Sequence, residues 1–282
     1  MLTLPAPAKI NLYLHITAIR NNGMHELATA FAFTEACDLL SFEVCPNIQV
    51  SCSEPALSGE QNLVHQVLQA FKDQHHISQG LHVFIDKHIP AQAGLGGGSS
   101  DAATAIMAAN QLWNIHACRD ALIDFATPFG ADIACFLYGK ASLASGIGAT
   151  LIDYPQALPK QTLLLARPAS GLCTADVFAH FDSTLTTPDT LDTMRRDSSS
   201  IGENDLEASA CALNPDVAQL LVYLRQQTDT AWMSGSGSTC VALFDTRQQA
   251  QQMSDMLQEK NLASWTHMGN ICDIHPMMLS TS

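Results

Sequence analysis

The chain has 282 residues, of which 47% are hydrophobic and 14% charged, and it carries a formal net charge of -14. These values suit one large or two ordinary globular domains with a sizeable core, and they exclude general disorder. Between Met1 and Phe71 the basic residues are limited to Lys9 and Arg20. Because nucleic-acid binding requires clustered Lys and Arg, we expect no nucleic-acid partner.

The cysteines and histidines show no pattern typical of a disulfide framework or a zinc site. Nine cysteines are scattered without a C-x-x-C pair, which is typical of free thiols in a reducing compartment. No Cys or carboxylate joins the histidines at zinc-ligand spacing, so we interpret the following four as surface residues: His75, His76, His82 and His88. We find neither a signal-peptide pattern nor an apolar run of membrane-spanning length, and we expect no membrane partner.

Strands and helices alternate through the first half of the chain. Two-residue alternation from Ile10 to Ile16 predicts a half-buried strand, and apolar residues three and four positions apart predict helices. The predicted strands span residues 9–19, 39–45, 48–52 and 81–89, with a further short strand ending at Gly146. The predicted helices span residues 62–76, 101–113 and 119–126.

The second half follows a candidate linker at residues 155–160, which contains two prolines. The predicted strands span residues 162–167 and 240–244, and the predicted helices span 205–212, 215–228 and 247–260. Residues 183–204 are rich in Ser, Thr and Asp and are predicted to form a loop. This mixture predicts an α+β or α/β protein of two domains, which we divide into residues 1–155 and 156–282.

The segment Pro90-Ala-Gln-Ala-Gly-Leu-Gly-Gly-Gly-Ser-Ser100, here called the glycine loop, is followed directly by a predicted helix. Glycines leave backbone N–H groups uncovered, and the helix adds its positive end, so the pair favours a bound phosphate. The loop matches neither the Walker pattern nor the dinucleotide fingerprint, because Ser99 stands where they require Lys or Gly. A flexible turn is the alternative, although glycine costs conformational entropy. Ser99, Ser100 and Asp101 are candidate helix caps, phosphate ligands, or both.

Three further features carry candidate chemistry, each with a structural alternative. Lys9 begins an apolar strand and lies on the same face as Asn11, so it is a candidate site residue. A charged residue that protects a sheet edge is an equally good interpretation. Asp132 lies among apolar residues, where a carboxylate is costly to bury unless paired. Taken alone, Asp132 is best interpreted as a helix cap. The alternative is that Asp132 pairs with Lys9 and acts as a base. The glycine-rich turn Ser234–Thr239 by itself suits a hairpin.

Together these features resemble the GHMP kinase superfamily. The glycine loop is similar to its central phosphate motif, Pro7-Ala-Lys-Ile-Asn-Leu12 to its first motif, and Ser234-Gly-Ser-Gly237 to its third. The resemblance narrows to the 4-diphosphocytidyl-2-C-methyl-D-erythritol kinases on four further segments, namely Gly23-Met-His25, Asn62-Leu63, Gly130-Ala-Asp132 and Asn204-Asp-Leu-Glu207. It implies a two-domain α+β (two-layer α/β) GHMP kinase fold. Residues 1–155 would form a ribosomal-protein-S5-like ATP-binding domain, and residues 156–282 a ferredoxin-like substrate-side domain.

The resemblance implies an ATP-dependent and Mg²⁺-dependent kinase. Its expected substrate is 4-diphosphocytidyl-2-C-methyl-D-erythritol, phosphorylated on the 2-hydroxyl in the non-mevalonate route to isoprenoid precursors. One alternative is a GHMP kinase acting on mevalonate, homoserine or a sugar. Another is a non-catalytic nucleotide-binding regulator on the same fold. We expect the small-molecule substrate as partner, a bacterial cytoplasmic location, and either a monomer or a homodimer.

The resemblance also implies a role for each residue of this chain that matches a functional position of the family. Lys9 and Asp132 match the catalytic pair. The ATP-binding positions are Pro90, Ala91, Gln92, Ala93, Gly94, Leu95, Gly96, Gly97, Gly98, Ser99 and Ser100, with Asn62 and Lys87 beside the adenosine and Ser100 as a candidate metal ligand. The substrate positions are Asn11, Met24, His25, Phe178, Gly235, Ser236 and Gly237.

The sequence departs from the family pattern at two places. The family has Tyr at the position of Met24, where it stacks on cytosine. Such a stack contributes ~1 kcal/mol beyond area burial, and Met still packs on a ring through its sulfur. Residues Ile133-Ala-Cys135 stand where Val-Pro is usual. We expect that change to affect backbone stiffness beside Asp132 more than the chemistry.

Overall fold

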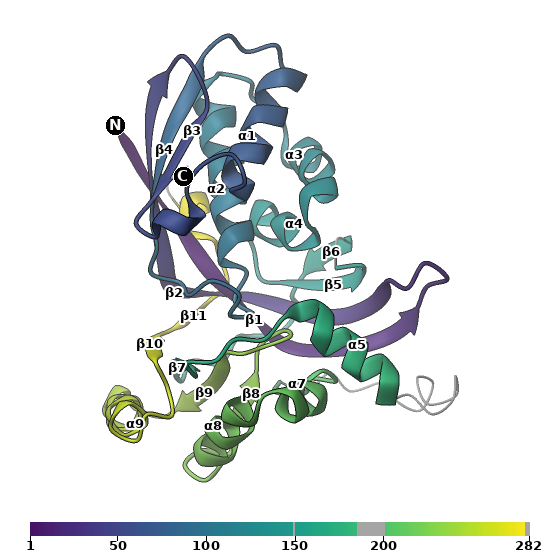
Figure 1. Cartoon of the computed structure of the whole chain (residues 1–282), viewed down its shortest axis with the longest axis vertical. Helices are drawn as coiled ribbons and strands as arrows, with labels where there is room; N and C mark the ends of the chain where they lie inside the picture. Colours follow the sequence, from purple (N-terminus) through teal and green to yellow (C-terminus); the bar gives the residue numbers. More distant parts are fainter. Residues whose placement is uncertain (149, 185–200, 280–282) are drawn as a thin grey trace.

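The computed structural model describes residues 1–148, 150–184 and 201–279, and within these ranges the strands form sheets of seven and four strands. The larger sheet has the order β3-β4-β2-β5-β6, with β1 and β11 also paired to β2. Its strands are β1 (Leu2–Ile19), β2 (His25–Cys45), β3 (Gln49–Cys52), β4 (Gly80–Asp86), β5 (Ser142–Gly146), β6 (Thr150–Asp153) and β11 (Ile271–Cys272). β1 and β2 form one long antiparallel hairpin that crosses the molecule (Figure 1).

Helices of the first half pack together beside the larger sheet (Figure 1). They are α1 (Leu63–Gln74), α2 (Gly97–Leu112), α3 (Arg119–Ala126) and α4 (Ala131–Tyr138), with 3-10 turns η1 (Pro55–Leu57) and η2 (Thr127–Phe129). α1 buries one stripe, from Val64 through Val67 and Leu68 to Phe71, at the spacing of an amphipathic helix. α2 is buried around most of its circumference, since alanines let α1 and α4 approach it closely.

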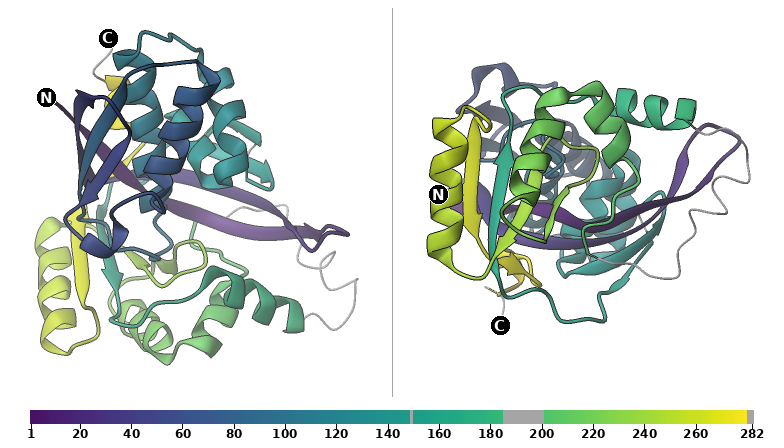
Figure 2. Two further views of the ribbon diagram at one scale, coloured as in Figure 1. Left: turned by 45° about the horizontal axis from the view of Figure 1, so that its top comes forward. Right: turned by 90° about the horizontal axis from the view of Figure 1, so that it is seen from below.

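The smaller sheet has the order β10-β7-β9-β8. Its strands are β7 (Thr162–Arg167), β8 (Ala231–Met233), β9 (Cys240–Phe244) and β10 (Trp265–Gly269). The accompanying helices are α5 (Thr174–Thr184), α7 (Glu207–Leu213), α8 (Pro215–Arg225) and α9 (Arg247–Glu259). The chain then returns to the larger sheet through β11 and ends its described part in α10 (Pro276–Leu279). Figure 2 shows the β1–β2 hairpin running between the helices of the first half and the elements of the second.

Most predicted elements are confirmed, three of them to the residue: 119–126, 162–167 and 240–244. The prediction was wrong for β2, which starts at His25 rather than at residue 39. Residues Ala30–Phe33 at its centre are all buried, so the alternation that identifies a half-buried strand is missing there. α2 starts four residues early, because the glycines themselves enter the helix. Of the loop predicted at 183–204, residues 185–200 lie outside the described part of the chain.

The two sheets share a core built on β1. Ile10 and Leu12 of β1 are fully buried in one cluster with Leu163 and Leu165 of β7. Trp232 of β8 joins this cluster with no exposed surface, and its Nε1 donates a hydrogen bond to Asn11 O at 2.8 Å. β1 is therefore a structural element of both halves. Among the described residues, no helix combines the length and apolar character needed to cross a bilayer.

We expect Trp232→Phe to lower the free energy of unfolding by about 2–4 kcal/mol, because it removes buried volume and the buried hydrogen bond to Asn11 O. Trp113→Phe is the matched control. Trp113 is also buried, but its Nε1 has no hydrogen-bond partner among the described residues, so this variant loses volume without losing a hydrogen bond. Urea unfolding followed by circular dichroism measures both losses. Equal losses would show that the hydrogen bond between the two halves adds nothing to stability.

Candidate active site

The glycine loop connects β4 to α2 and borders a cavity of about 350 Å³. Gly96 is the N-cap of α2, with a left-handed φ of 69°, and it has no side chain to cover the helix end. Gly97, Gly98 and Ser99 form the first turn and line the cavity, so their N–H groups are at its wall. The prediction that Ser99, Ser100 or Asp101 caps the helix was wrong. The open helix end lies where an anion would bind.

Close contacts with neighbouring atoms explain why the loop needs glycine at Gly94 and Gly96. At Gly94, a Cβ atom would lie 2.4 Å from Ser234 O, and its φ of +75° is left-handed as well. At Gly96, a Cβ atom would lie 3.1 Å from Lys9 Cγ. The loop is also tied by hydrogen bonds from Lys9 N to Leu95 O (2.9 Å) and from Thr239 N to Ala93 O (3.2 Å). The three motifs of the sequence therefore meet at one place.

Lys9 and Asp132 lie close together in the lining of this cavity. Lys9 Nζ lies 3.7 Å from Asp132 Oδ2, donates to Asn11 Oδ1 at 2.7 Å, and lies 5.3 Å from the ring centroid of Phe31. Lys9 is 4% exposed, so protection of a sheet edge does not describe it. The cap interpretation of Asp132 was wrong, because Gly130 is the N-cap of α4 and Asp132 is in its first turn. Its side chain is 44% exposed and open to solvent.

The turn Ser234–Thr239 connects the antiparallel strands β8 and β9, so the hairpin interpretation is confirmed. The same turn also lines the cavity with Gly235 and Ser236. Ser234, which sequence reasoning did not select as a site residue, accepts a hydrogen bond from Asn11 N (3.1 Å) and donates one to Gly94 O (3.2 Å). It thereby joins the turn to both β1 and the glycine loop.

The cavity brings most of the predicted site residues together. Its lining includes Lys9, Asn11, Asp132, Phe178, Gly235, Ser236 and every glycine-loop residue except Leu95 and Ser100. It also includes apolar residues that the sequence did not indicate, namely Leu14, Leu27, Phe31, Leu63, Ile147 and Leu206. These residues come from distant segments, and apart from Leu63 and Leu206 they belong to no motif, so no local signal marks the other four.

Seven predicted residues lie outside this lining, namely Leu95, Ser100, Asn62, Lys87, Met24, His25 and Gly237. Gly237 lies behind it and contacts Gly94 through its carbonyl, and Ser100 is fully buried with a hydroxyl that has no hydrogen-bond partner among the described residues. Met24 is 44% exposed in the turn between β1 and β2. His25 packs on Phe178 with ring centroids 4.6 Å apart, and its Nε2 is 2.7 Å from Asp182 Oδ1. The His25–Phe178 contact connects the start of β2 to α5.

A second cavity, of about 420 Å³, also borders the glycine loop. Asn62 and Lys87 line it together with Ala91, Gln92 and Gly98, which also line the first cavity. Asn62 is partly engaged locally, because its Oδ1 accepts from Val64 N and its Nδ2 donates to Leu57 O. The glycine loop thus borders two adjacent cavities.

Lys87 belongs to a buried charge cluster that sequence reasoning did not find. Its ammonium contacts Asp38 and lies 3.0 Å from Asp101 Oδ2. Asp38 Oδ1 also accepts from His88 N (2.6 Å) and Ile89 N (2.8 Å), directly before the glycine loop. The cluster therefore holds both ends of the loop, at the exit of β4 and in α2.

Burial controls the charges of this cluster. Desolvation raises the pKa of Asp101 to about 8, although Lys87 opposes the shift. For Lys87, burial acts to lower the pKa, but the two carboxylates prevail and raise it above its ordinary value. Two carboxyl groups share one ammonium out of contact with water, which favours a proton on Asp101.

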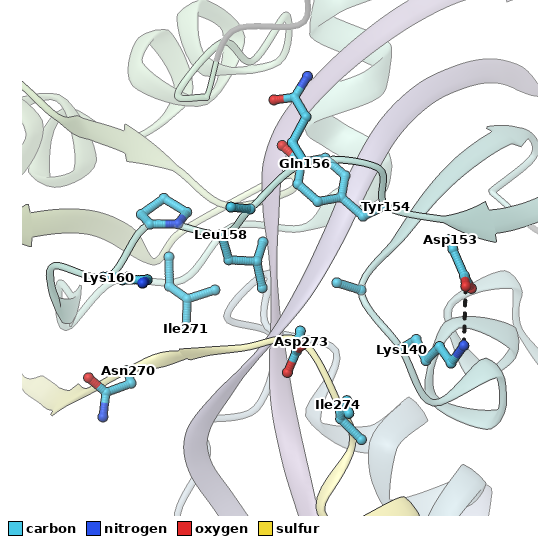
Figure 3. Close-up of a pocket in the computed structure, with 13 residues that line it drawn as sticks. Lys140, Asp153, Tyr154, Gln156, Leu158, Lys160, Asn270, Ile271, Asp273 and Ile274 are labelled. Atoms are coloured by element: carbon cyan, nitrogen blue, oxygen red, sulfur yellow. Dashed lines mark hydrogen bonds and ion pairs between the residues drawn. The ribbon is translucent and has the colours of Figure 1, made fainter.

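The largest of these cavities, about 710 Å³, contains none of the predicted site residues among its described lining (Figure 3). It lies between the segments around Tyr154–Lys160 and Asn270–Ile274. Lys140 on its rim pairs with Asp153 at 3.1 Å, so that ammonium is already compensated. In the described part of the chain, no group of three or more His, Cys, Asp or Glu side chains is placed to hold a metal ion.

Comparison with known proteins places the chain among kinases of small molecules. Residues 62–140 match the GHMP kinases N terminal domain, and residues 189–262 match the GHMP kinases C terminal model. A relative from Ralstonia nicotianae named 4-diphosphocytidyl-2-C-methyl-D-erythritol kinase is 35% identical, covering 90% of this chain and 89% of its own length. One of the same name from Alcanivorax borkumensis is 32% identical, covering 98% and 92%.

Solved structures agree in fold. A crystal structure of 4-(cytidine 5'-diphospho)-2C-methyl-D-erythritol kinase has a TM-score of 0.79 at 28% identity, covering 96% of this chain and 99% of that chain. A crystal structure of L. major mevalonate kinase in complex with R-mevalonate has a TM-score of 0.71 at 14% identity, covering 98% and 97%. At that identity the second match concerns the fold alone.

Asp101→Asn tests the charge cluster through the pH dependence of stability. Between the ordinary carboxyl pKa of 3.8 and the raised value of about 8, the folded protein holds a proton that the unfolded chain releases. Wild-type stability should therefore fall as pH rises through this window, by at most ~1.4 kcal/mol per pH unit. The variant should lose this part of the slope in urea unfolding between about pH 5 and about pH 8. The exposed Asp124→Asn should keep it, and identical slopes in all three proteins would contradict the assignment.

Proposed function

The chain belongs to the GHMP kinase family, and from that premise we propose that its site transfers the γ-phosphoryl group of ATP to the 2-hydroxyl of 4-diphosphocytidyl-2-C-methyl-D-erythritol. It has the two-domain α+β fold of the family, and its use of ATP follows from membership of these kinases. The substrate is proposed from relatives of that name that are 32–36% identical over most of the chain. The enzyme is thus a phosphotransferase acting on an alcohol in isoprenoid precursor synthesis.

The approach of Lys9 to Asp132 beside the open end of α2 carries the proposal. Phosphoryl transfer requires positioning and charge stabilisation more than covalent chemistry by the protein. The N–H groups of Gly97, Gly98 and Ser99 are proposed to bind the ATP phosphates, helped by the helix dipole. The ammonium of Lys9, 3.7 Å from Asp132, offsets the negative charge of the transferring group.

Asp132 is the proposed general base. Its carboxylate is 44% exposed at the cavity, within reach of an incoming alcohol, whereas Lys9 behind it is buried. Asp132 would accept the proton of the 2-hydroxyl as the oxygen bonds to phosphorus. Lys9 would hold the carboxylate in place, and Asn11 holds Lys9 through the hydrogen bond at 2.7 Å.

Magnesium is part of the proposal as the ion that neutralises ATP phosphate charge. Because Mg²⁺ in such sites takes most ligands from phosphate oxygens and water, few protein ligands are required. Ser100, the last residue of the loop, fits this limited role, since its buried hydroxyl has no hydrogen-bond partner among the described residues. Asn62 and Lys87 are proposed to border the adenosine through the second cavity, with Lys87 contributing its stem rather than its paired ammonium.

The cytidyl end of the substrate is proposed to lie near Phe178 and His25. Their ring contact at 4.6 Å provides an aromatic surface between the two halves, and Phe178 lines the cavity. Met24, next to His25, is exposed enough to pack on a base through its sulfur. Gly235, Ser236 and Gly237 are proposed to border the erythritol phosphate from the opposite turn.

We also propose the domain division at residue 155, with ATP bound by residues 1–155 and substrate contacts added by 156–282. The two family matches fall on either side of this boundary, although β11 and α10 return to the larger sheet. A bacterial cytoplasm is the proposed location, supported by the nine free cysteines and by the need for ATP.

Asp132→Asn should lower kcat by ~100-fold or more and leave ATP affinity nearly unchanged. Asp120→Asn is a matched control, because Asp120 occupies the same second position of α3 that Asp132 occupies in α4, away from the cavity. Both variants lose the same helix-end charge, and only the first should lose turnover. Near-normal turnover of Asp132→Asn in a coupled ADP assay would remove Asp132 from the role of base.

The substrate is tested with a panel of alcohols in the presence of ATP and magnesium. We expect turnover of 4-diphosphocytidyl-2-C-methyl-D-erythritol, because His25 and Phe178 form a surface suited to a nucleobase. Turnover of mevalonate, homoserine or a sugar instead would assign another substrate. ATP binding without turnover of any member would indicate a nucleotide-binding regulator.

A further inference from the structure

A short chain of hydrogen bonds runs from Lys9 into the β1–β2 ladder. Lys9 Nζ donates to Asn11 Oδ1 at 2.7 Å, and Asn11 Nδ2 donates to Thr29 Oγ1 at 2.8 Å. Thr29 Oγ1 in turn donates to the carbonyl oxygen of Tyr13. Lys9, Asn11 and Thr29 are 4%, 2% and 1% exposed, so water does not compete for these bonds. The chain leads from the proposed catalytic lysine to a residue of β2 that no motif includes.

The chemistry of its two ends fixes the direction of every bond in the chain. An ammonium only donates, and a backbone carbonyl only accepts. The single hydrogen of the Thr29 hydroxyl is committed to the carbonyl of Tyr13, so its oxygen is left to accept from Asn11. The Asn11 amide must then present its NH₂ to Thr29 and its oxygen to Lys9. Rotated by half a turn, it would direct donors at the ammonium and leave Thr29 without its donor.

The backbone of Asn11 is held independently of Thr29. Its N–H donates to Ser234 Oγ at 3.1 Å, and its carbonyl accepts from Trp232 Nε1 at 2.8 Å. A shift in the β1–β2 register between Asn11 and Tyr13 accompanies this arrangement. The position of Asn11 is thus set by the second half of the chain, and the orientation of its amide is set by Thr29.

We propose that Thr29 is a positioning residue for phosphoryl transfer, acting on Lys9 through the amide of Asn11. This inference rests on the proposed catalytic role of Lys9. Without the Thr29 hydroxyl, both orientations of the amide become accessible, and one of them repels the ammonium. Lys9 Nζ then loses its nearest acceptor and its placement beside Asp132. Thr29 itself contacts neither ATP nor the alcohol in this scheme, so its loss affects the reaction step rather than ATP binding.

Thr29→Val tests the proposal, with Thr29→Ser and Thr34→Val as companions. Thr34 lies on the same strand and is also 1% exposed, but its hydroxyl lies 3.5 Å from its nearest acceptor, Ala8 O. Both Val variants replace a buried hydroxyl with a methyl group. We expect Thr29→Val to lower kcat by ~10-fold or more with ATP KM within about twofold of wild type. Thr29→Ser, which keeps the hydroxyl, should restore most of kcat, and Thr34→Val should retain it.

A second measurement reports on Asn11 without depending on activity. The side-chain NH₂ of Asn11, assigned in NMR spectra with an Asn11→Asp variant, should be protected from solvent exchange in wild type and Thr34→Val. Protection should be lost in Thr29→Val. An unchanged Asn11 signal in Thr29→Val, or equal loss of kcat in both Val variants, would overturn the proposal. Wild type inactive on every alcohol would refute the proposed function, while the NMR comparison would still decide whether Thr29 orients Asn11.

Discussion

The arrangement of the candidate site depends on the backbone of β1 between Lys9 and Leu14, which both halves of the chain use as a hydrogen-bonding partner. Lys9 N binds the glycine loop at Leu95 O. Asn11 N and O bind the third motif through Ser234 and Trp232. Further along, Leu12 O accepts from Gly202 N, and Leu14 N donates to Glu203 O. One strand therefore sets the mutual placement of the glycine loop, the proposed catalytic pair and the turn Ser234–Thr239.

Two buried lysines near the glycine loop serve different purposes because their neighbours differ. Lys9 has one carboxylate at 3.7 Å that is itself 44% exposed, so that carboxylate remains available to a substrate. Lys87 lies between Asp38 and Asp101, which are 0% and 4% exposed, and its ammonium is fully used by the protein. Removing charges from water costs about as much as such contacts return, so this cluster adds little net stability. Its effect is to fix the two ends of a loop that has four glycines in five positions.

Local patterns predicted much of the fold and part of the site. The strands at 162–167 and 240–244 follow from continuous apolar runs, and the glycine loop follows from the entropic cost of glycine. Local patterns alone gave the pairing of Lys9 with Asp132 only as an alternative, because a lone carboxylate near a helix start more often caps it. The resemblance to the GHMP kinases implied the pair. The first half of β2 was missed, since burial on both faces removes the alternation that identifies a strand.

The sequence by itself indicated the available chemistry: glycines before a helix that favour a phosphate, one Lys and one Asp proposed for proton transfer, and few Lys and Arg in the first 71 residues. It did so because glycine, charge and hydrophobic period act locally, within a few residues. Only the tertiary structure decided which groups meet. Thr29 and Asn11, Asp38 and Lys87, and His25 and Phe178 are separated by 18, 49 and about 150 residues, and each pair is in contact. Strand register and burial bring such pairs together, because an unsatisfied buried polar group is costly. No local sequence pattern indicates which residue the partner is.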